Sequence, residues 1–140
     1  MRQILLFAAL AASLALLSGC TLSKTKKDTP EDMTGKAAYH KISAEEAYEM
    51  MVSQEVVVVE VRTREEYDGG HIENAVLGPN ESIDSERPEA LPDKEATLLI
   101  YCRSGRRSKD AAQKLLALGY QSVYDFGGVI DWPYELVKEG

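Results

Sequence analysis

One cysteine of this sequence lies in surroundings that favour its ionisation. Cys102 follows the apolar run 98–101, and the residues after it, up to position 109, include four cations and no acid. We expect the turn at Gly105 to form a cradle of backbone N–H groups before a helix that begins near Ser108. Because this cradle, the cations and the helix N-terminus all favour an anion, we expect the pKa of Cys102 below its ordinary value of about 8.5.

The segments around Cys102 alternate between strand and helix patterns. Strands are predicted where β-branched and apolar residues run together, at 56–61, 75–77, 97–101 and 123–126. Helices are predicted at 43–53, 63–69, 108–118 and 129–139; capping boxes begin the first two, and a glycine ends the third. The polar stretch 79–92 is predicted to be a loop with one helical turn. This alternation is typical of a parallel sheet covered by helices on both faces.

Three ordered motifs resemble those of the rhodanese family. Cys102-Arg103-Ser104-Gly105-Arg106-Arg107 has the form of its active loop, Cys-x-x-Gly-x-Arg before a helix. An earlier motif covers Glu60 to Ala75 and contains Gly70-His71-Ile72, and a closing motif covers Leu118 to Trp132 and contains Gly127-Gly128. Glu60 replaces the usual Asp, and Asn74 stands where Gly is common. The resemblance implies a three-layer α/β/α domain with a five-stranded parallel sheet.

The resemblance also implies a sulfurtransferase. Cys102 would take the outer sulfur of an anionic donor, such as thiosulfate or a polysulfide, and hold it as a persulfide. The acceptor would be cyanide, a thiol or a thioredoxin-like redox partner. Substrate contacts are expected from the loop, with Arg107 as the first choice among its cations; the loop residues are Arg103, Ser104, Gly105, Arg106, Arg107 and Ser108. Glu60 and Arg62 either steady this loop from behind or form an ordinary ion pair at a strand end.

Two other functions remain open at this stage. An anion cradle behind a cysteine also suits phosphatase or arsenate reductase chemistry, but Cys102 to Arg107 is six residues, and the phosphatase relatives of this fold have one more. The domain could instead be a partner-dependent persulfide carrier or sensor with little turnover of its own. We interpret His71 as a packing residue, and the sequence has no Cys/His cluster with the spacing of metal ligands, so we expect no metal and no cofactor.

The N-terminus has the pattern of an export signal. Residues 4–17 form an uncharged run of fourteen residues, shorter than the roughly 20 that a membrane-spanning helix needs. Its length fits the apolar central region of a secretory signal peptide, which is roughly 7–15 residues long. Leu17-Ser18-Gly19-Cys20 resembles the lipobox of bacterial lipoproteins, so we expect residues 1–19 to be a signal peptide and Cys20 to be lipidated.

The remaining chain is predicted to be a tether over 20–40 and one domain over 41–140. A lipid on Cys20 would place the domain in the cell envelope, facing the periplasm, with the outer membrane a possible site, or the cell exterior. Lipidation would also leave Cys102 without a disulfide partner. Residues 41–140 contain 11 Lys and Arg against 20 Asp and Glu, a balance of −9, which argues against nucleic acid as a partner. We expect a monomer that binds small sulfur-containing anions.

Overall fold

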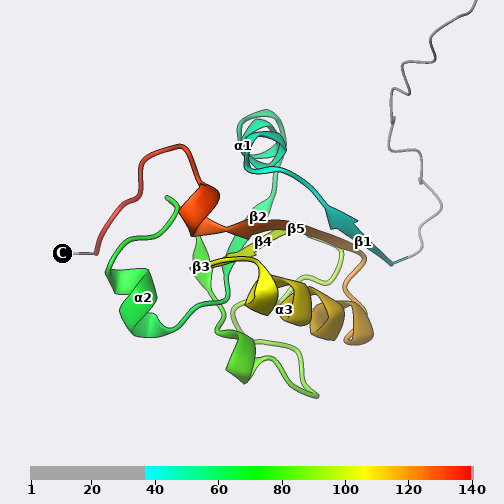
Figure 1. Cartoon of the computed structure of the whole chain (residues 1–140). Helices are drawn as coiled ribbons and strands as arrows, with labels where there is room; N and C mark the ends of the chain where they lie inside the picture. The colour runs from blue at the N-terminus through cyan, green and yellow to red at the C-terminus, as the bar shows by residue number, and fades with distance from the viewer. Residues whose placement is uncertain (1–36, 140) are drawn as a thin grey trace, which may run out of the picture. The chain divides into compact units, whose positions relative to one another are not determined.

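Five parallel strands form one sheet in the computed structural model, which describes residues 37–139 of the chain (Figure 1). Their order across the sheet is β1-β5-β4-β2-β3, and every neighbouring pair is parallel. The strands are β1 (Ala38–Lys41), β2 (Val57–Glu60), β3 (Val76–Leu77), β4 (Thr97–Cys102) and β5 (Ser122–Gly128). The predicted fold class is confirmed, and Cys102 ends the central strand.

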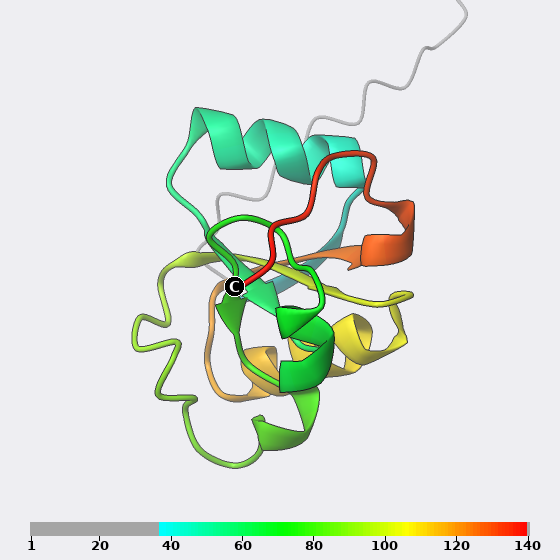
Figure 2. The same ribbon diagram turned by 90° about the vertical axis from the view of Figure 1, so that its left-hand side faces the viewer.

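Helices cover both faces of this sheet. Helix α1 (Ala44–Ser53) lies over one face and α3 (Arg106–Ala117) over the other (Figures 1 and 2). Successive residues of β4 divide between the two cores: Leu99 and Tyr101 pack on the α1 side, whereas Leu98, Ile100 and Cys102 pack on the α3 side. Burying each large apolar side chain contributes roughly 1.5–3 kcal/mol, so both faces stabilise the strand that carries Cys102.

The two predicted capping boxes are present. In α1 the Ser43 hydroxyl accepts the Glu46 N–H at 3.1 Å, and the Glu46 carboxylate accepts the Ser43 N–H at 2.7 Å. Thr63 and Glu66 repeat this exchange at the start of α2 (Arg64–Asp68). These short-range signals are complete within four residues of sequence, which is why the sequence alone located both helix starts.

Strand β5 contains a bulge beside Cys102. Ile100 lies opposite Asp125 and Tyr101 lies opposite Gly127, so Phe126 is the extra residue. Phe126 packs against the ring of Tyr101, with 5.2 Å between centroids, while Asp125 is buried on the α3 side. Bulges are frequent next to active sites because they redirect side chains. Here the bulge leaves a carboxylate behind the Cys102 loop.

The predicted domain boundary at residue 41 falls inside a strand. Residues 38–40, assigned to the tether from the sequence, form β1 together with Lys41 and pair with β5; the His40 ring stacks on Tyr124 at 4.5 Å. A four-residue edge strand with alternating burial has no apolar run to reveal it. The signal peptide 1–19, Cys20 and the first part of the tether lie outside the described residues.

The predicted final helix over 129–139 is wrong. The chain makes only a 3₁₀ turn, η2 (Val129–Asp131), before it continues in extended form. Pro133 explains the difference, since it has no N–H to donate and it disfavours helical backbone at Trp132, whose ψ is 115°. Beyond it, Val137 exchanges backbone hydrogen bonds of 2.9 and 2.8 Å with His71, which brings the C-terminal segment beside α2 (Figure 2).

The remaining predictions on local structure are close to what is observed. The loop after β3 contains the expected helical turn, η1 (Asn80–Ser82). Helix α3 begins at Arg106 instead of Ser108, and Gly119, with φ 95°, follows its C-cap as predicted. Within residues 37–139 no helix is both long enough and apolar enough to cross a bilayer.

Candidate active site

Cys102 lies at the carboxyl end of the central strand, immediately before a three-residue turn into α3. Its side chain is buried, with 1% of the residue exposed. Gly105 ends the turn with φ 100°, a left-handed conformation that glycine adopts without steric cost. This conformation directs the Gly105 N–H back to the Cys102 Sγ at 3.0 Å. The predicted cradle of backbone N–H groups is therefore present.

The cradle lowers the pKa of the Cys102 thiol. Burial of the sulfur raises the pKa, but hydrogen bonds from the backbone N–H groups of Ser108, Gly105 and Ser104 and from the Ser108 side chain together outweigh it, so the net shift is below the ordinary value. Arginine charge is not among the main causes of this shift. The direction predicted from the sequence is therefore confirmed, whereas the cations contribute less to it than the sequence suggested.

Gly128 fixes the position of the loop. A Cβ atom at this residue would lie 2.6 Å from the Cα of Ser104 and would overlap the carbonyl oxygen of Arg103. The same carbonyl accepts a hydrogen bond from the Ile130 N–H at 3.2 Å. The backbone of the Cys102 loop therefore rests directly on the end of β5. The second glycine of the closing motif is needed for this contact.

The Ser108 hydroxyl connects the thiol to a buried acid. Its Oγ lies 3.7 Å from the Cys102 Sγ and donates to the Asp125 Oδ1 at 2.7 Å. Asp125 is 1% exposed and also accepts from Tyr39 at 2.9 Å, while Lys41 lies 3.4 Å from its Oδ1. The sequence analysis missed Asp125. The available signal was a single acid within the otherwise apolar strand 123–126.

Arg107 forms an ion pair with Glu66. Its two terminal nitrogens donate to the two carboxylate oxygens at 2.8 and 2.9 Å, and this pairing lowers the pKa of Glu66 to about 2. The arginine chosen first as the substrate contact is thus held by α2. The other two loop arginines, Arg103 and Arg106, have exposed side chains, as does Ser104.

Glu60 and Arg62 form a buried ion pair at the end of β2, 2.5 Å between Oε1 and Nε. Glu60 also accepts the Tyr101 hydroxyl, and Arg62 donates to the Gly70 carbonyl at 2.6 Å. No hydrogen bond or ion pair found among residues 37–139 joins either side chain to the loop 103–107. Of the two interpretations left open above, the structure matches the strand-end ion pair.

His71 has the packing role expected of it. Its ring stacks on Tyr67 with 3.6 Å between centroids, and its Nδ1 lies 2.9 Å from the Tyr67 carbonyl oxygen. The residue is 4% exposed. Across the described part of the chain, no group of three or more His, Cys, Asp or Glu side chains is arranged to hold a metal ion.

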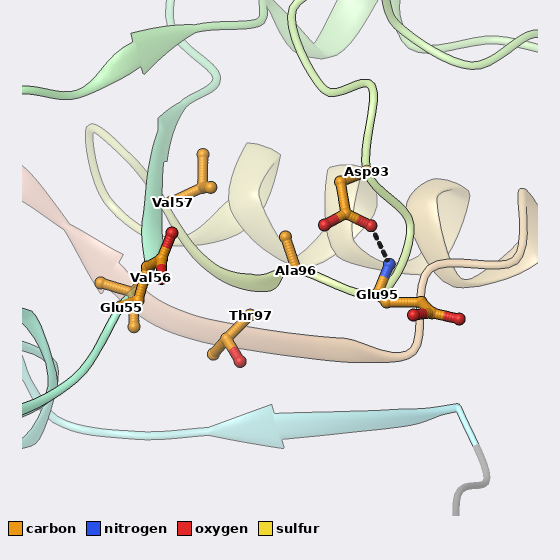
Figure 3. Close-up of a pocket in the computed structure, with 7 residues that line it drawn as sticks. All are labelled: Glu55, Val56, Val57, Asp93, Glu95, Ala96 and Thr97. Carbon is orange, nitrogen blue, oxygen red and sulfur yellow. Dashed lines mark hydrogen bonds between the residues drawn. The ribbon is translucent and has the colours of Figure 1, made fainter.

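Among the pockets of the described part of the chain, two lie at opposite ends of the strands. One, of about 460 Å³, borders the active loop, and its lining includes Ser104, Gly105, Gly128 and Lys41. The other, of about 290 Å³, lies at the amino ends of β2 and β4 (Figure 3). Its lining carries the carboxylates of Glu55, Asp93 and Glu95, which disfavour anions. Only the first pocket is next to the nucleophile.

Known proteins share the sequence pattern and the fold of this chain. A family model described as "Rhodanese-like domain" matches residues 43–133. A solved rhodanese with anions from E. coli is 32% identical and has a TM-score of 0.55; the match covers 61% of this chain and 100% of that one. A human single-domain sulfurtransferase is 27% identical with a TM-score of 0.58, over 66% of this chain and 93% of that one.

Curated relatives are longer than this chain. The tRNA uridine(34) hydroxylase of Yersinia pestis is 29% identical over 106 residues, which are 72% of this chain and 30% of that protein. The enzyme of the same name from Yersinia enterocolitica is 28% identical over the same shares. The chain thus matches about 30% of the length of these relatives, one domain of a larger protein.

Proposed function

The chain belongs to the rhodanese-like domain family, and on this premise we propose that it is a sulfurtransferase that works through a persulfide on Cys102. It takes sulfane sulfur from an anionic donor such as thiosulfate or a polysulfide and passes it to a thiophilic acceptor. The observation that carries the proposal is the Gly105 N–H bond of 3.0 Å to a sulfur whose pKa is lowered. A thiolate is the form of cysteine that attacks sulfur.

In the first half-reaction, the Cys102 thiolate attacks the outer sulfur of the donor. A new S–S bond forms to Cys102, and the bond between the outer sulfur and the rest of the donor breaks with its electron pair. From thiosulfate the leaving group is sulfite, and the negative charge of the thiolate moves to the terminal sulfur of the persulfide. Backbone N–H groups of the cradle are placed to stabilise this charge, without reorganising as it develops.

The exposed side chains of Arg103 and Arg106 are the cations that we assign to binding the donor anion. Arg107 contributes less positive charge because Glu66 neutralises it across two hydrogen bonds. The domain as a whole is acidic, with a balance of −9 over residues 41–140. At physiological salt, screening over about 8 Å limits the repulsion from distant acids, so two local cations suffice to attract a small anion.

In the second half-reaction, an external nucleophile attacks the terminal persulfide sulfur. With cyanide the products are thiocyanate and the Cys102 thiolate, which returns the enzyme to its starting state. Cys102 is the one free cysteine that residues 37–139 contain, so no resolving thiol from this part of the chain competes. We therefore propose a diffusible thiol or a thioredoxin-like partner as the physiological acceptor.

Intact-protein mass spectrometry tests this proposal. The full chain carrying Cys20→Ser, so that Cys102 is the only thiol, is incubated with thiosulfate and then with cyanide. We expect a gain of one sulfur atom that cyanide removes with release of thiocyanate. The matched control is the same chain with Cys102→Ser, which should gain nothing.

A chain that loads no sulfur from thiosulfate or polysulfide would contradict the free-standing enzyme. In that case a partner-dependent persulfide carrier or sensor becomes the better proposal. Sulfur transfer from a persulfidated donor protein would then distinguish a carrier from an inactive domain. Hydrolysis of a phosphate ester or reduction of arsenate would instead favour the oxyanion chemistry, against which the six-residue span Cys102 to Arg107 argues.

We do not extend the tRNA activity named for the longer relatives to this chain. Proteins that bind nucleic acid carry a basic surface. The formal balance of −9 over residues 41–140 is of the opposite sign. The cationic loop of Arg103, Arg106 and Arg107 is small, which suits a small anion better than a polynucleotide.

We also propose that the domain is exported and held in the cell envelope by lipid on Cys20. The support is the sequence Leu17-Ser18-Gly19-Cys20 after an apolar run of fourteen residues. More than one acyl chain on this cysteine would give stable anchoring. Metabolic labelling with a fatty acid in a bacterial host should label the parent chain but not Cys20→Ser. Equal labelling of both would contradict the proposal.

A further inference from the structure

A buried carboxylate lies behind the active loop and faces four donors. Asp125 accepts hydrogen bonds from the Ser108 hydroxyl at 2.7 Å, the Gly127 N–H at 2.9 Å and the Tyr39 hydroxyl at 2.9 Å. The Lys41 ammonium lies 3.4 Å from its Oδ1 and is half exposed. Asp125 itself is 1% exposed. A charge with this burial is tolerated because each oxygen has donors.

The hydroxyl of Ser108 has one proton and three oxygen acceptors within reach. They are the Asp125 Oδ1 at 2.7 Å, the Gly105 carbonyl at 3.0 Å and the Gly127 carbonyl at 3.3 Å. Hydrogen bonds to a charged oxygen are shorter and about twice as strong as those between neutral groups. The Ser108 hydroxyl therefore donates its hydrogen to Asp125, and the lone pairs of its oxygen are free to accept hydrogen bonds from other groups.

This direction of the Ser108 proton affects Cys102. The two side chains are 3.7 Å apart, so Ser108 can accept the S–H of the neutral thiol. Ser108 cannot donate a hydrogen bond to the thiolate while its single hydroxyl hydrogen is donated to Asp125. We infer that Asp125 is a positioning residue that moderates the ionisation of Cys102 by withholding the Ser108 proton from the sulfur. The relevance of this inference to catalysis rests on the proposed function; the ionisation itself does not.

Moderation of this kind suits a thiol that must attack sulfur repeatedly. The nucleophilicity of a thiolate falls as its pKa falls, and the best attacking thiol has a pKa near the ambient pH. Burial raises the pKa of Cys102, the backbone N–H groups of the cradle lower it, and the Ser108 hydroxyl lowers it further to the extent that it donates to the sulfur. Asp125 opposes this last effect, so the cradle and Asp125 together keep the sulfur both ionisable and reactive.

The other charged groups around this site would remain when Asp125 is changed. Lys41 and Tyr39 face it from β1, and Arg107 approaches Cys102 from α3 with Glu66 opposite it on α2. Burial, the hydrogen bond to Asp125 and its charge raise the pKa of Tyr39 to about 12, so this hydroxyl stays a donor at neutral pH. Asp125→Asn keeps an oxygen for Ser108 and Gly127, removes the charge, and presents an amide NH2 to the Tyr39 hydroxyl, which can accept from it.

The test measures the pKa of Cys102 without any sulfur donor. In the full chain with Cys20→Ser, thiolate absorbance is followed against pH, and the rate of alkylation by iodoacetamide is measured below the pKa. We expect Asp125→Asn to lower the pKa by roughly 0.5, which raises the thiolate fraction about threefold. Because each thiolate is then less nucleophilic, the alkylation rate should rise about twofold. The matched control is Glu89→Gln, which removes one exposed acid from the loop after η1 and should change neither.

A double-mutant cycle separates action through Ser108 from the direct effect of charge. In a Ser108→Ala background, Asp125→Asn should produce less than half of the pKa shift that it produces alone. An equal shift in both backgrounds, or no shift in either, overturns the inference. Because no sulfur transfer is measured, this result stands or falls independently of the proposed function.

Lys41→Gln provides a variant that keeps the buried carboxylate and changes only its half-exposed cationic partner. Lys41 is half exposed, so this change is compatible with folding even if Asp125→Asn is not. Removing its charge strengthens the hold of Asp125 on the Ser108 proton and leaves the acid unbalanced near the sulfur. We expect the pKa of Cys102 to rise and alkylation to slow by about twofold. Faster alkylation would overturn the inference.

Discussion

The guanidinium of Arg107 and the carboxylate of Glu66 form two parallel hydrogen bonds, 2.8 and 2.9 Å long, between the first turns of α3 and α2. Glu66 also accepts the Thr63 N–H at 3.0 Å, so one carboxylate both caps α2 and fixes α3. The helix that follows the nucleophile is therefore oriented by a residue 41 positions earlier in the chain. No local sequence signal reports such a contact.

Glu66→Gln should weaken the domain at neutral pH. Both side chains of the pair are partly exposed, at 19% and 29%, so we expect a loss of about 1 kcal/mol in the free energy of unfolding. Arg107 holds the pKa of Glu66 at about 2, below its ordinary value of 4.5. A depressed pKa stabilises the fold above about pH 4.5, and this stabilisation is lost as the pH falls toward 2.

Urea unfolding at several pH values measures this effect. The difference between the parent and Glu66→Gln should be largest at pH 7 and should shrink steadily below pH 4.5. Glu49→Gln, which removes an exposed acid on α1, is the matched control and should change stability little. A constant difference down to the lowest pH would show that the charge of Glu66 does not cause the effect.

Gly128→Ala should displace the active loop. The added methyl group overlaps the backbone of Arg103 and Ser104, which cannot rotate away as a side chain can. We expect a loss of about 1–3 kcal/mol in unfolding free energy from this overpacking. Misplacement of the cradle should also slow sulfur loading by roughly tenfold or more.

Gly78→Ala is the matched control for this variant. The nearest atom to a Cβ at Gly78 is the Val59 Cγ1 at 3.7 Å, an ordinary van der Waals contact. Thermal unfolding and sulfur loading by mass spectrometry are measured for both variants. Equal behaviour of the two would mean that the contact between Gly128 and the loop is not what positions Cys102.

Local sequence signals were sufficient to predict most of the helix starts. They were not sufficient for the features that depend on contacts between residues far apart in the chain. Ser43 and Thr63 cap helices through residues three positions away, and both were predicted. Strand β1 was missed because its identity as a strand comes from pairing with β5, some 84 residues later. The final helix was predicted with Pro133 tolerated in its first turn, but the backbone restriction that Pro133 imposes ended the helical turn before it.

The hydrogen bond from the loop backbone to Cys102 was predictable from the sequence, whereas the wider surroundings of the cysteine were only partly so. A cysteine, a glycine and a helix start within six residues were enough to indicate Cys102 and its cradle. The arginines were predicted to be substrate ligands because several positive charges close to a thiol suggest a binding site for an anion. The structure pairs Arg107 with Glu66 and places Asp125 behind Ser108, and both contacts depend on how the sheet brings distant strands and helices together.

The rate of sulfur loading should follow the ionisation of Cys102. Backbone N–H groups of Ser108 and Gly105 lower the pKa of the thiol despite its burial. As the pH rises, the thiolate fraction and the loading rate should therefore rise together to a plateau. The midpoint of this rise should lie below the ordinary cysteine pKa of about 8.5. Stopped-flow loading with thiosulfate from pH 5 to 10 gives the midpoint; one at or above 8.5 would contradict stabilisation by the cradle.

Arg106→Gln should weaken the binding of anionic donors more than the chemical step. The Arg106 side chain is exposed, and a single exposed charge is worth somewhat under 1 kcal/mol, which corresponds to a rise in KM of about threefold for thiosulfate. Added salt should reduce this difference, because it screens the same charge in the parent. Arg87→Gln, in the loop after η1, removes an equal charge remote from the Cys102 loop and should leave KM unchanged.

An uncharged organic trisulfide should be used equally well by the parent and by Arg106→Gln. A similar loss with the uncharged donor would mean that Arg106 shapes the loop instead of attracting the anion.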